Sequence, residues 1–364
     1  MTYPVAEVFG TFLKLGLTSF GGPIAHLGFF RDEIVTRRKW LDDQDYTSLV
    51  ALCQFLPGPT SSQVGFALGL RRAGWFGALA AFVAFTAPSA VLMVLFAHVA
   101  APLPVDGLKL VAVAIVAQAV LGMVQSLCPD RARATIAIAA VGLLAVLPIW
   151  AMPVVIALGA AAGMAVLHPQ PAPPAALRLV RKWVAAVALI AFLAFFLFLP
   201  ARLDGFYRAG SLVFGGGHVV LPLLQAELGG AIPPEAFLAG YAAAQAVPGP
   251  LFTFAAYLGA VLDPAGPAAV LALVAIFLPG FLILIAALPF HAMLGTSARA
   301  GVMGANAAVV GVLGAALYDP IFTSAVGSAG DFALVLAMFG LLVLWKAPPW
   351  LVVMIGLGVS VALR

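Results

Sequence analysis

The sequence predicts an all-α polytopic membrane protein built from two homologous halves. Three observations carry this prediction. The chain is 64% hydrophobic and only 9% charged, its mean hydropathy is +1.13, and two helix-breaking motifs each occur twice. Soluble domains carry roughly a quarter charged residues, so no soluble fold explains this composition.

The two motifs recur in the same order in each half. Gly-Gly follows Phe20 and again follows Phe214, while Pro-Gly-Pro stands at Pro57–Pro59 and again at Pro248–Pro250. Around Gly-Gly, residues match 194 positions later, and around Pro-Gly-Pro they match 191 positions later. The matched pairs are Phe12/Phe206, Gly16/Gly210, Phe20/Phe214, Gly21/Gly215, Gly22/Gly216, Glu33/Glu227, Gln54/Gln245, Gly58/Gly249 and Pro88/Pro279, and Lys14 matches Arg208 in charge.

This duplication divides the chain into three parts. We expect an N-terminal repeat at residues 1–167, a linker with a connecting helix at 168–200, and a C-terminal repeat at 201–364. The Pro-rich stretch His168–Pro174 marks the linker, and Trp183–Leu199 is the additional helix. No removable signal peptide is expected at Met1–Gly10.

Apolar runs indicate where the membrane helices lie, since a full span needs about 20 residues. The candidates are Val5–Gly22, Gly74–Val99, Gly107–Leu127, Thr135–Leu147, Met152–Leu167, Trp183–Leu199, Gly205–Leu224, Pro267–Phe290, Arg299–Leu317, Phe332–Trp345 and Trp350–Ala362. Around each Pro-Gly-Pro the segments are half as long: Tyr46–Leu56 with Thr60–Leu70, and Ala236–Val247 with Leu251–Leu262.

Charge placement favours halves of opposite orientation. Arg37, Arg38 and Lys39 follow the first break, whereas the matching loop 225–235 has two Glu and no Lys or Arg. Inversion requires each Pro-Gly-Pro pair to cross as one discontinuous helix. If the pairs are re-entrant hairpins instead, the four arginines Arg71, Arg72, Arg131 and Arg133 of the first half all lie more comfortably on the cytoplasmic side.

The breaks are the candidate binding site. A helix interrupted in a bilayer frees backbone groups that lipid cannot satisfy, so it is tolerated where it lines a cavity or is buried in protein. Glycines let a ligand approach backbone N–H donors, and a helix N-terminus with hydroxyls suits an oxyanion. The candidates are Gly21, Gly22, Gln54, Gly58, Thr60, Ser61 and Ser62 in the first half, and Gly215, Gly216, Gln245, Gly249 and Thr253 in the second. The alternative is that these residues only kink and pack helices.

Several titratable residues flank the breaks. Lys14 lies within an apolar helix, and with Arg208 it would attract an anion, unless it reaches to the interface. Glu33 and Glu227 are candidates for a coupling proton, although Glu33 could also pair with Arg31. His26 and His218 follow their breaks and could donate to an oxyanion, or they could be interfacial without a role. The charged loop Arg31–Asp45 also suits a solvated surface.

The sequence offers no enzyme motif, no clustered metal ligands and no basic tract of the kind that binds nucleic acid. Cys53 and Cys128 are far apart in sequence and read as packing residues. We therefore expect neither cofactor nor metal, and no nucleic-acid partner.

At this point the residues resemble a known family, the chromate ion transporters in their long, two-domain form. F-G-G-P-I-A-H at Phe20–His26, R-R-K-W-L at Arg37–Leu41 and P-G-P-T at Pro57–Thr60 resemble its first half. F-G-G-G-H-V-V-L-P-L-L-Q at Phe214–Gln225 and Q-A-V-P-G-P-L-F-T-F-A-A-Y-L-G at Gln245–Gly259 resemble its second. The resemblance covers the whole chain.

The resemblance implies a multi-pass protein of the bacterial plasma membrane that exports chromate and has oppositely oriented halves. We expect alternating access driven by protons or a counter-anion, since no ATP motif exists. Sulfate is an alternative substrate, because it is also a tetrahedral dianion. An enzyme or an assembly scaffold is the alternative from another class. The lipid bilayer is the expected surrounding, and a homodimer is left open.

Overall fold

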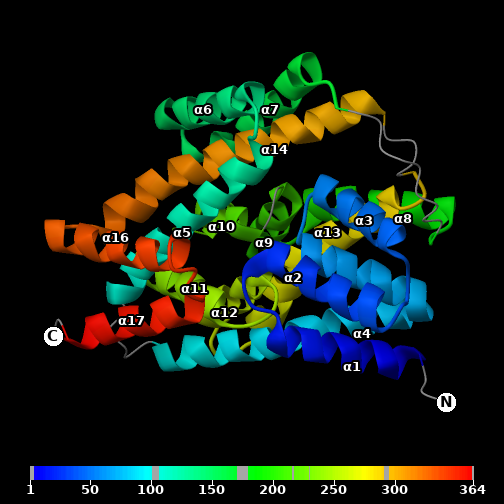
Figure 1. Cartoon of the computed structure of the whole chain (residues 1–364), viewed down its shortest axis with the longest axis horizontal. Coiled ribbons are helices and arrows are strands. Elements are labelled where there is room, and N and C mark those ends of the chain that lie inside the picture. Colours follow the sequence, from blue (N-terminus) through cyan, green and yellow to red (C-terminus); the bar gives the residue numbers. More distant parts are fainter. Residues whose placement is uncertain are drawn as a thin grey trace.

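The computed structural model describes residues 4–100, 106–169, 179–214, 217–228, 230–290 and 295–362. Every regular element in these ranges is a helix, which confirms the all-α prediction (Figure 1). Most of the Pro-rich stretch His168–Pro174 that marks the expected linker lies outside the described residues, since 170–178 are not described.

The first half begins with two short helices and ends with a helix pair. Its elements are α1 (Pro4–Thr18), α2 (Gly22–Arg31), the π-helix η1 (Asp32–Arg37), α3 (Asp43–Phe55), α4 (Thr60–Ala100), α5 (Asp106–Leu127), α6 (Arg131–Val146), η2 (Ile149–Ala151) and α7 (Met152–Val166). The connecting helix is α8 (Lys182–Phe198).

The second half repeats this order. Its elements are α9 (Ala201–Leu212), η3 (Gly217–Val219), α10 (Val220–Leu228), α11 (Pro234–Ala246), η4 (Leu251–Thr253), α12 (Phe254–Leu262), α13 (Ala268–Ala287), α14 (Thr296–Ala316), η6 (Leu317–Phe322), α15 (Thr323–Ala325), α16 (Ala329–Val343) and α17 (Pro349–Ala362).

Both motifs interrupt helices, as the sequence predicts. Helix α1 ends at Thr18 and α2 begins at Gly22, while α3 ends at Phe55 and α4 begins at Thr60. In the second half α9 ends before its glycines and α11 ends before Pro248. The discontinuous helices expected at these motifs are therefore confirmed.

Helix α4 folds back on itself. Its 41 residues are interrupted at Ala73 and Gly74, whose backbone angles are not helical. A side chain added at Gly69 would meet the carbonyl of Gly77, a contact that a straight helix could not bring about. The residues after the first Pro-Gly-Pro thus form a tight hairpin, which α12 and α13 repeat in the second half.

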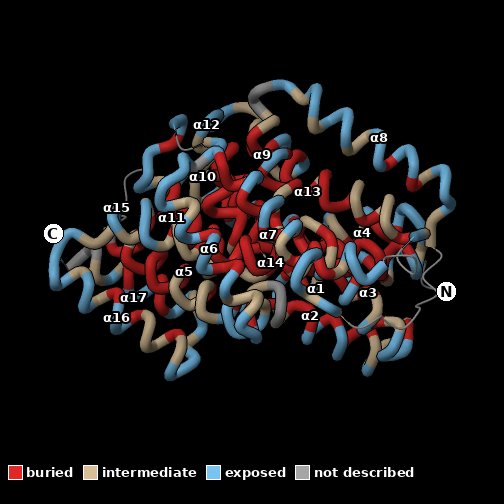
Figure 2. Tube along the Cα trace, turned by 90° about the horizontal axis from the view of Figure 1, so that it is seen from above, coloured by how far each residue is buried: buried red, intermediate tan, exposed pale blue. Residues whose placement is uncertain are grey.

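Four helical segments, one of which contains the α4 hairpin, are long and apolar enough by length and composition to cross a membrane, counted over the described residues alone. These segments are Thr60–Val99, Gly107–Leu127, Ala268–Ala287 and Thr296–Ala325. Five shorter apolar helices accompany them, among them α8, which lies at the edge of the molecule with most of its residues exposed (Figure 2). Together with the composition, these helices identify a multi-pass membrane protein.

The terminal helix pair of each half packs on the other half. Helices α6 and α7 of the first half cover α14 of the second, whereas α16 and α17 pack along α5 of the first (Figure 1). Small residues bring α7 and α14 close, because Gly159 and Gly163 face Gly304 across the contact. This exchange holds the two halves together.

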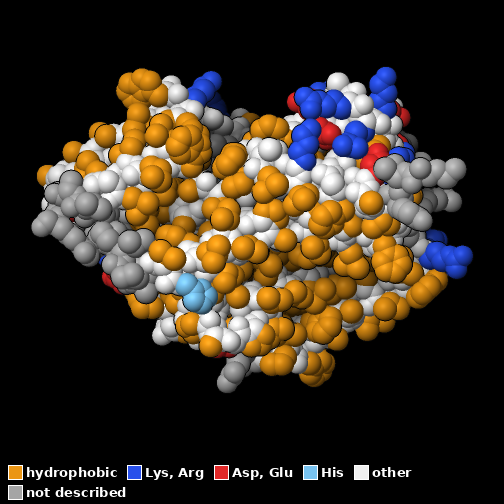
Figure 3. Space-filling view, turned by 90° about the horizontal axis from the view of Figure 1, so that it is seen from below, with side chains coloured by type: hydrophobic (Ala, Val, Ile, Leu, Met, Phe, Trp, Pro, Cys, Tyr) orange, Lys and Arg blue, Asp and Glu red, His pale blue; other side chains and the backbone are white. Residues whose placement is uncertain are grey.

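The surface divides by polarity. On the face shown in Figure 3, hydrophobic side chains cover most of the area, and Lys, Arg, Asp and Glu gather at the end where Figure 1 places α1 to α3. An apolar surface of this extent suits contact with lipid.

Candidate functional site

The four helix breaks meet where the two halves join. Gly58 donates its backbone N–H to the carbonyl of Val213 at 2.7 Å, and Gly249 donates to the carbonyl of Ser19 at 3.0 Å. Because Gly58 matches Gly249 and Ser19 matches Val213 in the repeat, the two bonds are reciprocal. Reciprocal contacts of this kind relate the halves by a pseudo-two-fold axis.

The glycine of each Pro-Gly-Pro is required by its surroundings. Gly58 has φ of 120° and Gly249 has φ of 102°, a region that side chains rarely adopt. A Cβ on Gly58 would lie 2.8 Å from the Cα of Gly280, and one on Gly249 would lie 2.7 Å from the Oγ of Ser89. Gly280 and Ser89 are themselves equivalent, so the same close approach is built twice.

The first half contributes a buried polar cluster to the junction. His26, 1% exposed, stands on α2 with its Nδ1 3.4 Å from the Oγ of Ser61, at the start of α4. Thr60 and Ser62 are buried beside Ser61. Three hydroxyls thus surround the N-terminus of α4, where free backbone N–H groups and the helix dipole favour an anion.

Several of these buried groups have no partner. Within the described chain no hydrogen bond satisfies the Oγ of Ser19, the Nε2 of His26, the Oγ of Ser62 or the Oγ1 of Thr86. Buried donors are normally paired, and leaving one unpaired costs about 1–3 kcal/mol. These atoms are therefore candidates for contact with a ligand.

Sequence reasoning missed Ser19 and Thr86. Each gives a signal that could have been used, because Ser19 directly precedes the first break and Thr86 stands two residues before Pro88 in an apolar helix. Gln63 was missed as well. Its Nε2 donates to the carbonyls of Pro57 and Gly280, both at 2.9 Å, which joins the first break to the second half.

The second half contributes one imidazole. His218, half-buried on η3, has its Nδ1 3.1 Å from the Oη of Tyr241 and 3.2 Å from the Nε2 of Gln245. Its own Nε2 faces the first half, since a Cβ added to Gly22 would lie 3.7 Å from it. The hydroxyl of Thr253 already has a partner nearby in the chain, because its Oγ1 donates to the carbonyl of Pro250 at 2.9 Å.

The predicted cation of the first half is ion-paired. The Nζ of Lys14 lies 2.9 Å from the Oε2 of Glu33, with the Lys14 side chain 51% exposed and the Glu33 side chain 8% exposed. Arg38 and Arg37 also contact this carboxylate. Glu33 follows α2, outside the long apolar helices, and the Lys14 ammonium together with Arg38 holds the pKa of Glu33 below its usual range.

The matching charges of the second half are arranged differently. Arg208 pairs with Asp204 at 2.7 Å and lies over the ring of Phe196 on α8. Glu227, which follows the apolar stretch 205–224, makes no ion pair with any side chain that the structure describes. Burial raises the pKa of Glu227 above its ordinary value.

The remaining candidates are placed as follows. Gly21 and Gly22 form the turn into α2, both with positive φ. Gln54 is exposed, unlike its counterpart Gln245. Gly215 and Gly216 lie outside the described residues, so their predicted role is not addressed by the structure.

Comparison with known proteins identifies the family of this chain. The family model described as Chromate transporter matches the chain twice, at residues 6–164 and 202–361. The chain belongs to the chromate transporter family. The double match also confirms the internal repeat and the resemblance noted in the sequence.

Two curated relatives align over most of the length of this family member. It is 29% identical over 355 residues to a chromate transport protein of Pseudomonas aeruginosa, covering 88% of this chain and 81% of the relative. It is 26% identical over 342 residues to a probable chromate transport protein of Synechococcus elongatus, covering 86% and 84%. A chromate transport protein of Cupriavidus metallidurans is 39% identical over 94 residues, covering 26% and 23%. No solved structure gives a significant match.

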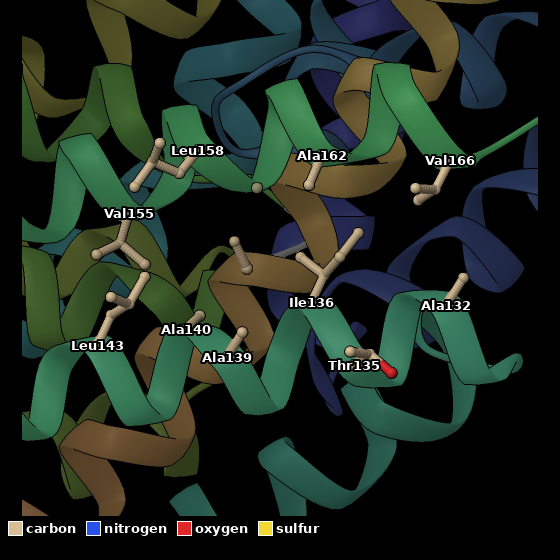
Figure 4. Close-up of a pocket in the computed structure, with 12 residues that line it drawn as sticks. Ala132, Thr135, Ile136, Ala139, Ala140, Leu143, Val155, Leu158, Ala162 and Val166 are labelled. Carbon is tan, nitrogen blue, oxygen red and sulfur yellow. The ribbon is translucent and has the colours of Figure 1, made fainter.

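A cavity of about 430 Å³ in this transporter-family chain lies away from the breaks, between α6, α7 and α14 (Figure 4). Its lining is aliphatic except for Thr135 on α6. Such a lining offers no set of donors for an anion.

Metal and thiol chemistry find no support in the described residues. No group of three or more His, Cys, Asp or Glu side chains there could hold a metal ion. Cys53 and Cys128 are buried free thiols.

Proposed function

We propose that the protein exports chromate across the bacterial cytoplasmic membrane without altering it chemically. Family membership supports chromate as the substrate. The observation that carries the site is the set of buried side-chain atoms of Ser19, His26, Ser62 and Thr86 for which the described residues offer no hydrogen-bond partner. Hydroxyl and imidazole donors together with a helix N-terminus match a tetrahedral oxyanion.

The anion is held mainly by the first half in this proposal. Thr60, Ser61 and Ser62 supply hydroxyls and backbone N–H groups at the start of α4, and the Gly21–Gly22 turn supplies backbone from α2. The second half closes the site with His218 and with the break at Gly249. Gln245 supports the site from behind His218.

Movement follows from the pseudo-two-fold arrangement. Two equivalent halves can exchange conformations about a site on their axis, as inverted-repeat transporters do. The reciprocal bonds of Gly58 and Gly249 lie at this junction and serve as its pivots. An inside-negative potential already favours anion exit by about 2.3 kcal/mol per charge and 100 mV. Proton gradient or anion exchange would supply the rest.

The charged residues have supporting roles in this scheme. Lys14 and Arg208 draw the anion toward the breaks, one turn before each of them. Glu33 holds Lys14 in place, and its release from the ion pair would accompany a conformational step. Glu227 is the better coupling candidate of the two carboxylates, because burial raises its pKa.

Sulfate is the second candidate substrate. The buried donors recognise tetrahedral oxygen geometry, and nothing in a set of hydroxyls, imidazoles and backbone N–H groups separates chromate from sulfate by charge. Selectivity between the two would then rest on size and on the cost of removing water.

Everted membrane vesicles test the proposal, since they take up what the cell exports. Vesicles with this protein should accumulate radiolabelled chromate, and control vesicles without it should not. Collapsing the proton gradient separates proton coupling from anion exchange. Absence of chromate uptake contradicts the proposal, and uptake of labelled sulfate in its place selects the second candidate.

A Lys14→Ala variant sharpens the assignment. We expect it to insert and fold but to lose most chromate uptake, because the pair with Glu33 no longer presents a cation beside the break. Uptake at the wild-type level would return Lys14 to a purely interfacial role.

A further inference from the structure

The ring of His218 in the second half lies against the first half, and its two nitrogens have different neighbours. Nδ1 faces Tyr241 and Gln245 on α11, whereas Nε2 faces the Gly21–Gly22 turn of α2. Tyr241 and Gln245 are one helical turn apart, so both side chains reach the ring from the same face of α11. The ring is therefore held on one edge and free on the other.

The contacts of Nδ1 determine which nitrogen carries the proton. An amide nitrogen can only donate, so the Nε2 of Gln245 requires Nδ1 to accept. The hydroxyl of Tyr241 can donate to the same lone pair. A neutral imidazole whose Nδ1 accepts has its proton on Nε2, and this N–H points toward the first half.

We propose that His218 is the donor that the second half gives to the bound oxyanion, and that Tyr241 and Gln245 are positioning residues that keep its proton on Nε2. This inference rests on the proposed oxyanion transport. In this proposal the two halves contribute different groups to the anion. The first half contributes hydroxyls, and the second half contributes the oriented imidazole of His218.

The first half lacks this arrangement, which provides an internal control. At the positions that match His218, Tyr241 and Gln245 it has Ile24, Val50 and Gln54. Gln54 precedes its own Pro-Gly-Pro as Gln245 does, yet it is exposed. The same substitution at Gln54 and at Gln245 therefore separates a general effect of the break from an effect on His218.

Few other ionisable groups lie on the elements packed against η3. Besides Tyr241, α11 contributes Glu235. Helix α10 contributes Glu227, and α14 contributes Arg299. Across the junction, α2 contributes His26 and Arg31. In the wild type, His218 contacts only Tyr241 and Gln245 among the side chains for which hydrogen bonds are described.

The central variant is Gln245→Glu in the full-length protein. A carboxylate accepts instead of donating, so the neutral ring moves its proton to Nδ1 and presents an acceptor to the oxyanion. At pH 8 we expect chromate binding to weaken about tenfold or more, the value of one hydrogen bond to a charged group. Acidification protonates the ring at both nitrogens and should restore most of the binding.

Binding is measured on purified protein from pH 6 to pH 8, with chromate as the probe, and each variant is divided by wild type at the same pH. This ratio removes the protonation of chromate itself. Gln54→Glu should give a ratio that does not change with pH, because no described hydrogen bond joins Gln54 to an imidazole. A pH-independent ratio for Gln245→Glu, or equal ratios for the two variants, overturns the inference.

Two more variants protect the test against misfolding. His218→Gln keeps an N–H donor and should retain part of the binding that His218→Ala loses. Tyr241→Phe should weaken binding less than Gln245→Glu, since the amide still orients the ring. Equal binding by His218→Gln and His218→Ala would overturn the role of the donor. Wild-type protein that binds no chromate contradicts the proposed function instead.

Discussion

The two halves share a backbone at their breaks but differ in the side chains placed on it. Ser19, His26 and Thr86 of the first half correspond to Val213, Val220 and Phe277 of the second. Ser61 and Gln63 likewise correspond to phenylalanines. In the second half the ring of Phe252, at the position of Ser61, packs on the ring of Phe277, at the position of Thr86.

This difference shows which residues of the repeat are fixed by backbone conformation and which are free to vary. Gly58 and Gly249 are identical because positive φ and a close backbone approach exclude other residues. Nothing in the backbone demands a hydroxyl or a ring beside them. The frame is therefore symmetric, while the buried hydroxyls without a described partner, those of Ser19, Ser62 and Thr86, all belong to the first half.

The largest expected effect comes from breaking the shared frame. Gly58→Ala combines an unfavourable φ with a Cβ 2.8 Å from the Cα of Gly280. We expect a loss of stability of about 3 kcal/mol or more, from backbone strain and overpacking together. Thermal unfolding in detergent measures it. Gly142→Ala is the control, because a Cβ there meets nothing within 4 Å, and an equal loss in both variants would refute the special role of the break.

The polar decoration of the first half is expected to matter for transport and not for folding. Thr86→Val removes an unpartnered buried hydroxyl, so stability should stay level or rise by about 1 kcal/mol. Chromate uptake should fall about tenfold, as expected when one donor to a charged group is lost.

Thr253→Val in the second half provides the matched comparison. Its hydroxyl already bonds the carbonyl of Pro250, so this variant should lose about 1 kcal/mol of stability. Parallel unfolding and uptake assays on both variants decide the matter, and unchanged uptake in Thr86→Val would remove that residue from the site.

Glu33 and Glu227 are matched in the repeat, but their contributions to stability should change with pH in opposite directions. The lowered pKa of Glu33 means that its ion pairs stabilise the fold above the unfolded-state pKa, about 4.3, and that this stability is lost as pH falls through the folded-state pKa. The raised pKa of Glu227 means that stability is lost as pH rises through its folded-state value.

Unfolding of the two Gln variants across pH tests this contrast. Glu33→Gln should flatten the loss of stability in acid. Glu227→Gln should make the protein relatively more stable near neutral pH. The same pH response in both variants would show that the two positions are not differently charged in the fold.

The smallest effect is expected at Arg208. Its ion pair with Asp204 is partly exposed and joins residues four positions apart on one helix. Such pairs contribute about 0.5 kcal/mol or less to stability. Arg208→Ala should therefore leave thermal unfolding almost unchanged. A large loss of stability would indicate that contact with Phe196 holds α8 in place.

Much of the fold could be read from the sequence. Gly-Gly and Pro-Gly-Pro end helices for local steric reasons, so their positions predict the boundaries of α1, α3, α9 and α11 to within a few residues. The offset between the copies predicts the repeat, because equal motifs adopt equal backbones. Partners across the junction were not predictable, as the reciprocal bond of Gly58 with Val213 joins residues 155 positions apart.

The sequence by itself determined that this is a helical membrane protein, that it is duplicated, and where its helices break. These properties depend on hydrophobicity and on backbone conformation, both of which are local. Only the tertiary structure decided that Lys14 is held by Glu33, that His218 reaches the Gly21–Gly22 turn, and that the hydroxyls of Ser19 and Thr86 are buried without a partner among the described residues. Burial and pairing depend on which distant segments pack together, and the helix breaks at the junction bring those segments into contact.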